Sequence, residues 1–300
     1  MLSIEPLGHT LGGRVTGVDL NAPLAHDDFA SILRALGEYG VLCFSDQPIE
    51  AAALRSFSAR FGELQVIAGA AGRTEPGMPE VSVLSNVVVN GHPIGIPDAG
   101  QDWHTDMTYN RVVGFVNVLV AKQVPMRDGK VLGATEFANT QAAYETLPEE
   151  VKAKLAGSTA THDWNNFHEL MRRKGSKRPA LTEAQRSQRP PVSHPVFLTH
   201  PISGRKVIYV NPGFTVKIDQ LAPDDSRDTL EYLFAHVLKP EYRYVHQWSV
   251  GDVLVWDHIG TWHYAVPDYR PDEYRLMKRC QVLADKIFDP AFMEGTLDSA

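Results

Sequence analysis

From residue 80 onward the chain is a succession of short β-rich runs, separated by turns that are rich in Gly, Pro, Asn and Asp. Short strands at such regular spacing are typical of an all-β sandwich or barrel. We therefore predict a mainly β fold with flanking helices. The predicted strands in this part of the chain are residues 81–84, 112–121, 192–199, 206–210, 242–247, 253–256 and 275–283.

Four other segments show the apolar spacing of amphipathic helices. Pro148 is expected to divide the third of them, and Gly62 lies just past the end of the second. Residues 163–191 are polar and basic with weak periodicity, which indicates a long surface insertion, or a lid over a site. No repeat or low-complexity stretch divides the chain, so residues 1–300 are predicted to form one domain. The helical segments are 27–39, 51–61, 140–155 and 224–238, and two further strands are expected at 12–20 and 41–44.

Composition and charge restrict the classes of protein to which the chain can belong. It is 43% hydrophobic and 22% charged, as globular proteins are, and its net charge of −7 argues against a protein that binds nucleic acid or membrane surfaces. The start of the chain has no signal-peptide pattern, and the longest apolar stretch is too short to span a bilayer, so a cytoplasmic location is expected. Cys43 and Cys280 lie in apolar stretches, which favours buried free thiols over a disulfide.

A candidate metal-binding motif lies near the start of the β-rich region. His104 and Asp106 are two residues apart in a Trp-His-Thr-Asp sequence. In an extended segment such residues point to the same side, so both side chains can reach one cation. Two histidines and one carboxylate form the ligand set of non-haem iron(II) oxygenases. The spacing alone is weak evidence, because His26 and Asp28 share it and are more simply interpreted as the start of a helix.

The C-terminal region supplies a second histidine and two cations. A strand that runs into a turn is followed by His263. Arg275 and Arg279 then occur in an apolar, strand-like context, where a buried cation needs an anionic partner. That partner is either a carboxylate of the chain, such as Asp285 or Glu273, or a ligand whose carboxylate binds in a bidentate manner.

Together these motifs resemble the taurine/2,4-D dioxygenase (TauD/TfdA) family of Fe(II)- and 2-oxoglutarate-dependent dioxygenases. The similarity covers nearly the whole chain and rests on the Trp-His-Thr-Asp motif, a distant Trp-Asp followed by His-Tyr-Ala, and an arginine further on. The resemblance implies a double-stranded β-helix (jelly-roll) core. Further similar segments are residues 17–20, 61–63, 209–215, 233–236 and 239–241.

The resemblance also implies roles for individual residues. His104, Asp106 and His263 are expected to bind Fe(2+), with 2-oxoglutarate and dioxygen (O2) as co-substrates. Arg275 and Thr135 are expected to bind the far carboxylate of 2-oxoglutarate. The family's reaction releases succinate and CO2 and hydroxylates an unactivated C–H bond. The presence of Asp106 argues against a halogenase, which needs a small residue at that position.

The substrate is predicted only by class. Arg279 matches an arginine that binds an anionic substrate group in some members of the family, so a small, anionic organic molecule is expected. Phe214 and Trp262 are candidates for residues that line the pocket, with plain core packing as the alternative. Residues 64–69 lack the histidine and tyrosine that hold taurine in the taurine enzyme, and Gly100 replaces its asparagine. Taurine is therefore not the expected substrate.

Two other functions stay open at this point. One is a desaturase, or another oxidative tailoring enzyme of a biosynthetic pathway, with the same cofactors. The other is a jelly-roll protein that binds a metal or ligand without turnover, from which substrate-dependent succinate formation would distinguish an enzyme. The resemblance makes a homo-oligomer plausible. The substrate itself cannot be predicted, because the pocket is assembled from the variable segments 64–73, 86–101 and 163–191.

Overall fold

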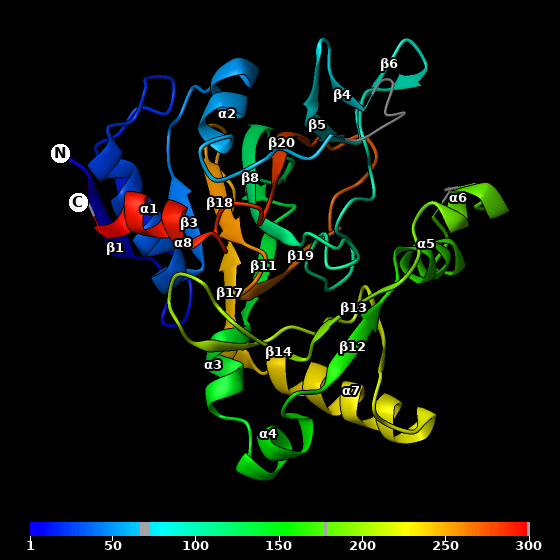
Figure 1. Ribbon diagram of the computed structural model, residues 1–300. Helices are drawn as coiled ribbons and strands as arrows, with labels where there is room; N and C mark the ends of the chain where they lie inside the picture. Colours follow the sequence, from blue (N-terminus) through cyan, green and yellow to red (C-terminus); the bar gives the residue numbers. More distant parts are fainter. Residues whose placement is uncertain (67–72, 177–178, 299–300) are drawn as a thin grey trace.

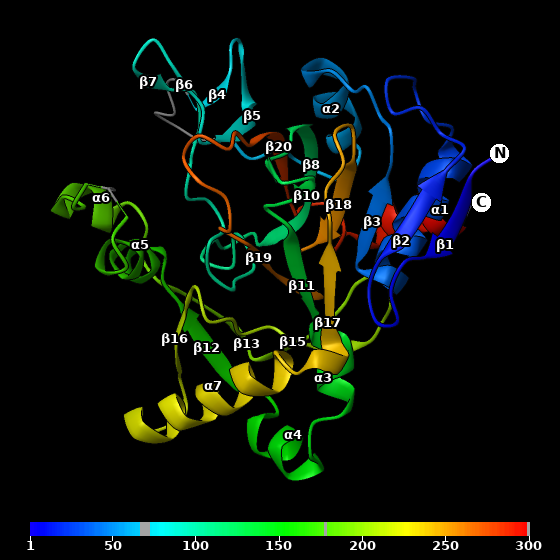
Figure 2. The same ribbon diagram turned by 180° about the vertical axis from the view of Figure 1, so that it is seen from behind.

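A computed structural model describes residues 1–66, 73–176 and 179–298. An eight-stranded sheet and a three-stranded sheet lie at its centre, with helices outside them (Figures 1 and 2). Phe137 of the small sheet packs in one core cluster with Leu119, Trp256 and Met277 of the large sheet, so the two sheets face each other. The predicted mainly β fold with flanking helices is confirmed.

The large sheet joins strands from both ends of the chain. Its strand β18 pairs with β3 and β8, and β20 pairs with β8 and β5, all in antiparallel fashion, whereas β2 and β3 are parallel. This order places the C-terminal strands in the middle of the sheet. In spatial order the strands are β1 (Ser3–Pro6), β2 (Gly13–Thr16), β3 (Val41–Phe44), β18 (Val253–Asp257), β8 (Gly114–Gln123), β20 (Leu276–Leu283), β5 (Met78–Ser85) and β4 (Thr74–Glu75).

The small sheet has β11 at its centre, between β17 and β19. In register, Phe137 of β11 lies directly opposite His263 of β19. Because successive residues of a strand point to opposite faces, His263 faces the large sheet together with Phe137, and Trp262 faces away from it. The strands of this sheet are β17 (Arg243–His246), β11 (Thr135–Asn139) and β19 (Thr261–Ala265).

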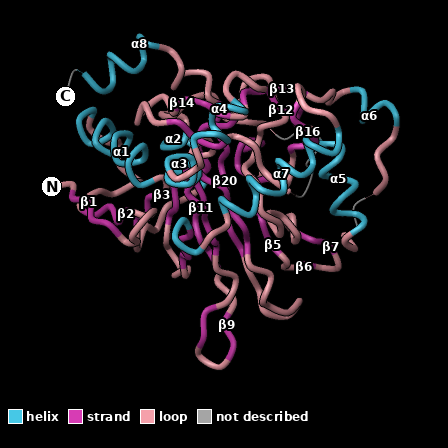
Figure 3. The backbone as a smooth tube through the Cα atoms, turned by 90° about the horizontal axis from the view of Figure 1, so that it is seen from below, coloured by secondary structure: helices cyan, strands magenta, loops and turns pink. Residues whose placement is uncertain are grey.

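The remaining strands form small sheets outside this centre. The predicted strand at 192–199 is two strands, because the chain changes partner at Val196: β13 pairs with β12, and β14 pairs with β15. The β9–β10 hairpin projects from the molecule (Figure 3). These strands are β12 (Thr159–His162), β13 (Val192–Pro195), β16 (Thr215–Ile218), β14 (Phe197–Thr199), β15 (Lys206–Ile208), β9 (Met126–Arg127), β10 (Lys130–Val131), β6 (Val88–Val89) and β7 (His92–Pro93).

Helices close the outer faces of both sheets and follow the predicted segments closely. α1 ends at Gly40, whose φ of 66° places it in the left-handed region that favours glycine. Pro148 separates α3 from α4 as predicted, whereas α2 ends at Ser58, before the predicted 61. None of the helices in the described ranges is long and apolar enough to cross a bilayer. The helices are α1 (His26–Tyr39), α2 (Ala51–Ser58), α3 (Thr140–Glu145), α4 (Glu149–Leu155), α7 (Pro223–Val237), η1 (Pro240–Tyr242), α8 (Pro290–Met293) and η2 (Glu294–Asp298).

The segment predicted as a weakly periodic insertion contains two helices, α5 (Trp164–Arg173) and α6 (Glu183–Ser187). Phe167 and Met171 of α5 are buried four residues apart, as on the inner face of an amphipathic helix. The expectation of weak periodicity was therefore wrong for α5. Residues 177 and 178 of the predicted insertion lie outside the described residues.

Both cysteines are free and buried, as predicted. Cys43 packs between the two sheets, whereas Cys280 packs in the core that α1 and α2 share with the large sheet, so the two thiols belong to different cores. Burial raises the pKa of each thiol to about 11. We expect the folded protein to be unreactive toward a thiol reagent at pH 8, because few thiolates are present and neither is accessible. Both cysteines should react after denaturation without reductant, and a protein that gives no thiol then would contain a disulfide.

Candidate functional site

A short backbone pairing brings His104 to His263. The N–H of His104 donates to the carbonyl oxygen of His263 at 3.1 Å, and the N–H of His263 donates to that of His104 at 2.8 Å. Their ring centroids are 4.1 Å apart. This isolated antiparallel bridge joins a loop to β19. The two imidazoles therefore lie together although 159 positions separate them in the sequence numbering.

Asp106 completes a buried triad with the two histidines. Its Oδ1 is 3.5 Å from Nε2 of His104, and its Oδ2 is 3.7 Å from Nε2 of His263. One ligand atom from each of the three residues lies within 4.8 Å of the others. The motif is not part of a regular strand, because a turn follows His104 and Met107 has a φ of 62°. The donor set and its spacing fit a single divalent ion of the kind bound by two histidines and a carboxylate.

Neighbouring groups orient two of the triad's side chains. Nδ1 of His104 lies 2.7 Å from the carbonyl oxygen of Asp102. If Nδ1 carries the proton, that bond leaves the Nε2 lone pair directed toward the triad. Gln281 donates from Nε2 to Oδ2 of Asp106 at 2.8 Å, and Nη1 of Arg279 is 3.4 Å from the same oxygen.

These contacts also set the charge of the triad. Burial alone would raise the pKa of Asp106, but the hydrogen bond to His104 and the charges of His104, Arg279 and His263 hold it well below its usual range. Burial lowers the pKa of His263. A carboxylate and a neutral imidazole are the states that bind a metal ion. The sequence analysis missed Gln281, although its position two residues after Arg279 on β20 places both on one face of the sheet.

Arg275 is a buried cation without a carboxylate partner in the part of the chain that the structure describes. It is 6% exposed, and its Nε has no hydrogen-bond partner. Neither predicted carboxylate pairs with it: Glu273 binds Arg127 in a bidentate manner, and Asp285 accepts a hydrogen bond from the N–H of Glu63. Burial lowers the pKa of Arg275. An unpaired buried guanidinium is costly, so this position fits an anionic ligand.

Thr135 begins the central strand of the small sheet and is 3% exposed. Its Oγ1 accepts a hydrogen bond from Nε1 of Trp248 at 3.0 Å. The hydroxyl proton of Thr135 therefore stays available for a further acceptor.

Aromatic residues lie against the triad on the side of His104. The ring centroid of Phe214 is 6.0 Å from that of His104, and Phe167 of α5 lies 6.1 Å from His104 and 4.5 Å from Phe214. Tyr109 is 4.7 Å from Phe214. We call Phe167, Phe214 and Tyr109 the aromatic wall. Phe167 and Tyr109 were missed because the sequence gives no local indication that their segments meet.

Trp262 does not line the site, and its prediction as a pocket residue is corrected. It is 1% exposed and belongs to the core between the small sheet and α7, where it packs edge-on against Phe234 at 5.8 Å. The physical reason is strand alternation: because His263 faces the large sheet, the preceding residue faces the opposite side. Plain core packing, the alternative for this residue, is what the structure shows.

Further buried polar atoms surround the triad. Both ring nitrogens of His258 and both side-chain polar atoms of Asn117 lack a partner among the described residues, and both residues are fully buried. The ring centroid of His258 is 5.9 Å from that of His263. His258 was predicted only as a turn residue. Such atoms are compatible with water or a polar ligand in the centre of the fold.

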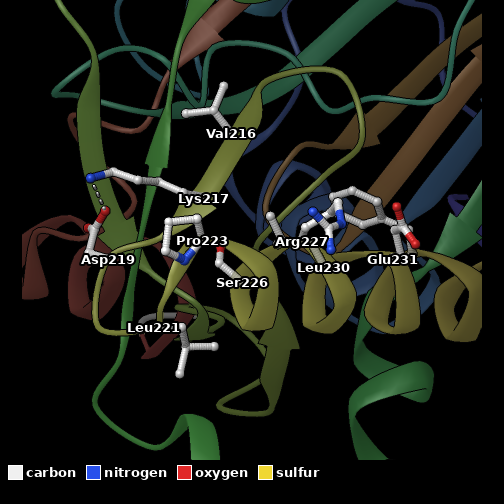
Figure 4. Close-up of a pocket in the computed structure, with 10 residues that line it drawn as sticks. Val216, Lys217, Asp219, Leu221, Pro223, Ser226, Arg227, Leu230 and Glu231 are labelled. Atoms are coloured by element: carbon white, nitrogen blue, oxygen red, sulfur yellow. Dashed lines mark ion pairs between the residues drawn. The ribbon is translucent and has the colours of Figure 1, made fainter.

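Two other features lie apart from the triad. Cys43, His246 and Asp252 form a second buried group with metal-like spacing, but His246 lies 3.1 Å from Asp252, which also accepts the N–H of Ser249 at 2.8 Å. This group is satisfied by its own hydrogen bonds. A cavity of about 430 Å³ lies between β16 and α7 (Figure 4), and its lining includes no residue of the triad.

Comparisons with known proteins are consistent with this site. Residues 3–281 match the model of a family described as "Taurine catabolism dioxygenase TauD, TfdA family". The chain is 32% identical over 298 residues to pentalenolactone F synthase of Streptomyces arenae, with 97% of each protein covered. It is 29% identical over 293 residues to the alpha-ketoglutarate-dependent 2,4-dichlorophenoxyacetate dioxygenase of Cupriavidus pinatubonensis, with 94% of this chain and 98% of that protein covered.

A solved structure shows the same arrangement of elements. The crystal structure of AAD-2 in complex with Mn(II) and N-oxalylglycine superposes with a TM-score of 0.80 at 26% identity, covering 95% of this chain and 98% of that chain.

Proposed function

The chain belongs to the TauD/TfdA family and is a 2-oxoglutarate-dependent dioxygenase, and from this premise we propose that it uses Fe(II) held by His104, Asp106 and His263. We propose further that it hydroxylates an unactivated C–H bond of a small, anionic organic substrate, with release of succinate and CO2. The observation that carries the proposal is the convergence of three buried ligands beside an unpaired buried arginine, Arg275. The two facing sheets form the jelly-roll core that holds them.

The proposed cofactors fit the residues present. When bound, Fe(II) together with 2-oxoglutarate and O2 supplies the oxidation of the C–H bond. Arg275 pairs with the far carboxylate of 2-oxoglutarate, and Thr135 donates its hydroxyl proton to the same group. Gln281 and Asp102 keep Asp106 and His104 in their orientations through the hydrogen bonds described above. The pairing of the two sheets excludes bulk water from the reacting centre.

The substrate's class follows from two groups beside the triad. Arg279 is close to Asp106, whose charge a bound metal would share, and its Nε is buried without a partner. An anionic group of the substrate would pair with this arginine. The aromatic wall offers an apolar surface on the side of His104, and α5 contributes Phe167 to it. We therefore propose that the region 163–191 covers the substrate and that the molecule combines an anionic group with an apolar body.

The experiment that tests this function begins without oxygen. Adding Fe(II) and 2-oxoglutarate to the protein should produce a weak visible charge-transfer band, because the co-substrate chelates the metal. Small anionic metabolites are then screened, with O2, for stimulated 2-oxoglutarate decarboxylation and matching succinate formation. A band without stimulation by any compound would favour a binding protein. A product that loses two hydrogen atoms, instead of gaining one oxygen atom, would identify a desaturase.

A further inference from the structure

The segment that leads to Arg275 is an exposed loop with little apolar contact to hold it. Residues 267, 268 and 270–272 and Tyr274 are exposed, whereas Arg275 is buried and begins the approach to β20. A bidentate pair with a carboxylate requires the guanidinium to be positioned to within tenths of an ångström. The position of Arg275 must therefore come from polar contacts of this loop.

Asn86 supplies the first set of contacts. Its Oδ1 accepts the N–H of Arg275 at 2.8 Å, and its Nδ2 donates to the carbonyl oxygens of Glu273 at 3.1 Å and Arg270 at 3.4 Å. One side chain, located just after β5, thus holds three backbone groups of the loop. The amide offers both a donor and an acceptor, which an apolar side chain or a carboxylate cannot do.

An ion pair supplies the second set. Arg127 of β9 donates from Nε and Nη2 to the two carboxylate oxygens of Glu273, at 2.6 and 2.5 Å, and from Nη2 to the carbonyl oxygen of Asp268 at 3.2 Å. The hydrogen bond from Arg127, with a further one from the N–H of Arg270, lowers the pKa of Glu273 to about 2. The projecting β9–β10 hairpin (Figure 3) is thereby fastened to the loop that precedes Arg275.

The Arg275 side chain itself lies against the residues that follow this hairpin. The N–H of Gly133 donates to Oδ1 of Asp268 at 2.7 Å. Gly133 has a φ of +70°, and a Cβ built on it would lie 3.3 Å from both Cδ and Nε of Arg275. Glycine at this position therefore lets the arginine stem approach the backbone. All these contacts converge on one side chain.

We propose that Asn86 and the Arg127–Glu273 ion pair are positioning residues that set the affinity for the dicarboxylate co-substrate by holding Arg275 in place. The proposal rests on the proposed function, because it takes Arg275 as the group that binds the far carboxylate of 2-oxoglutarate. The clamp acts on that carboxylate alone. It should therefore affect 2-oxoglutarate and leave the binding of a 2-oxo acid without a second carboxylate unchanged.

The test measures dissociation constants by anaerobic titration of the Fe(II)-loaded protein, with the charge-transfer band as readout. Asn86→Ala and Arg127→Met should each raise the Kd for 2-oxoglutarate about tenfold, since a displaced guanidinium loses much of its pairing. The Kd for pyruvate, which lacks the far carboxylate, should stay within about twofold of wild type. At saturating 2-oxoglutarate, kcat should recover. The double variant Arg127→Met/Glu273→Gln should bind no more weakly than Arg127→Met, because both changes break one pair.

Matched controls are Asn21→Ala, which removes an exposed turn amide, and Arg227→Met, which removes an exposed arginine paired with acids on α7. Both should bind 2-oxoglutarate as wild type does. If Arg275→Met weakens 2-oxoglutarate binding while Asn86→Ala and Arg127→Met leave it unchanged, the clamp is refuted and the proposed function stands. An equal loss of pyruvate and 2-oxoglutarate binding in the clamp variants would also refute it. A wild-type protein that binds pyruvate as tightly as 2-oxoglutarate would instead contradict the proposed function.

Discussion

His263→Ala is expected to lose the charge-transfer band and to reduce succinate formation by more than about 100-fold. The expected loss is large because changes in groups that only orient a metal ligand already cost about 10- to 100-fold in metal affinity or activity. Removing a ligand itself leaves His104 and Asp106 as the only members of the triad. Asp106→Asn should behave in the same direction, since the amide oxygen carries no charge to share with the metal.

Two measurements separate loss of metal binding from loss of structure. Iron content after gel filtration and the far-UV circular dichroism spectrum are compared for wild type, His263→Ala and His92→Ala, whose histidine is exposed in β7. His92→Ala should retain both iron and activity. A folded His263→Ala protein with wild-type iron content and turnover would remove the basis of the proposed function, because the triad would not be the metal site.

Local patterns in the sequence were enough to predict many elements but not their partners. The apolar spacing of 27–39 corresponds to α1, and Pro148 separates α3 from α4 as expected. The strand predicted at 192–199 failed at Val196, where the chain leaves one partner strand for another. Such a change depends on which strands lie alongside, and that information is not contained in the composition of the segment.

The site shows the same division between local and distant information. His104 and Asp106 were recognisable from their spacing, yet their contact with His263 depends on an isolated bridge between distant segments. The partner of Glu273 is Arg127, on a hairpin far away in sequence, so its pairing was not predictable from the loop alone. Trp262 is different, because strand alternation next to His263 was sufficient to place it outside the site.

Arg275→Met is expected to change ligand affinity and stability in opposite directions. The Kd for 2-oxoglutarate should rise about 100-fold, since two charge-assisted hydrogen bonds contribute about 1.5–3 kcal/mol each and part of that contribution is offset by desolvation. The free energy of unfolding of the protein without metal and co-substrate should rise by about 1 kcal/mol or more, because the substitution removes a buried cation that has no carboxylate partner among the described residues.

This pair of results distinguishes a ligand-binding arginine from a structural one. Removing one partner of a buried ion pair would instead lower the free energy of unfolding by about 3–5 kcal/mol. Arg60→Met is the matched control, because Arg60 donates to the carbonyl oxygen of Leu24 and lies 4.2 Å from the ring centroid of Phe29. That variant should be less stable and should bind 2-oxoglutarate as wild type does. Chemical denaturation and anaerobic titration measure both quantities. A destabilised Arg275→Met protein with an unchanged Kd would show that Arg275 serves the fold and not the co-substrate.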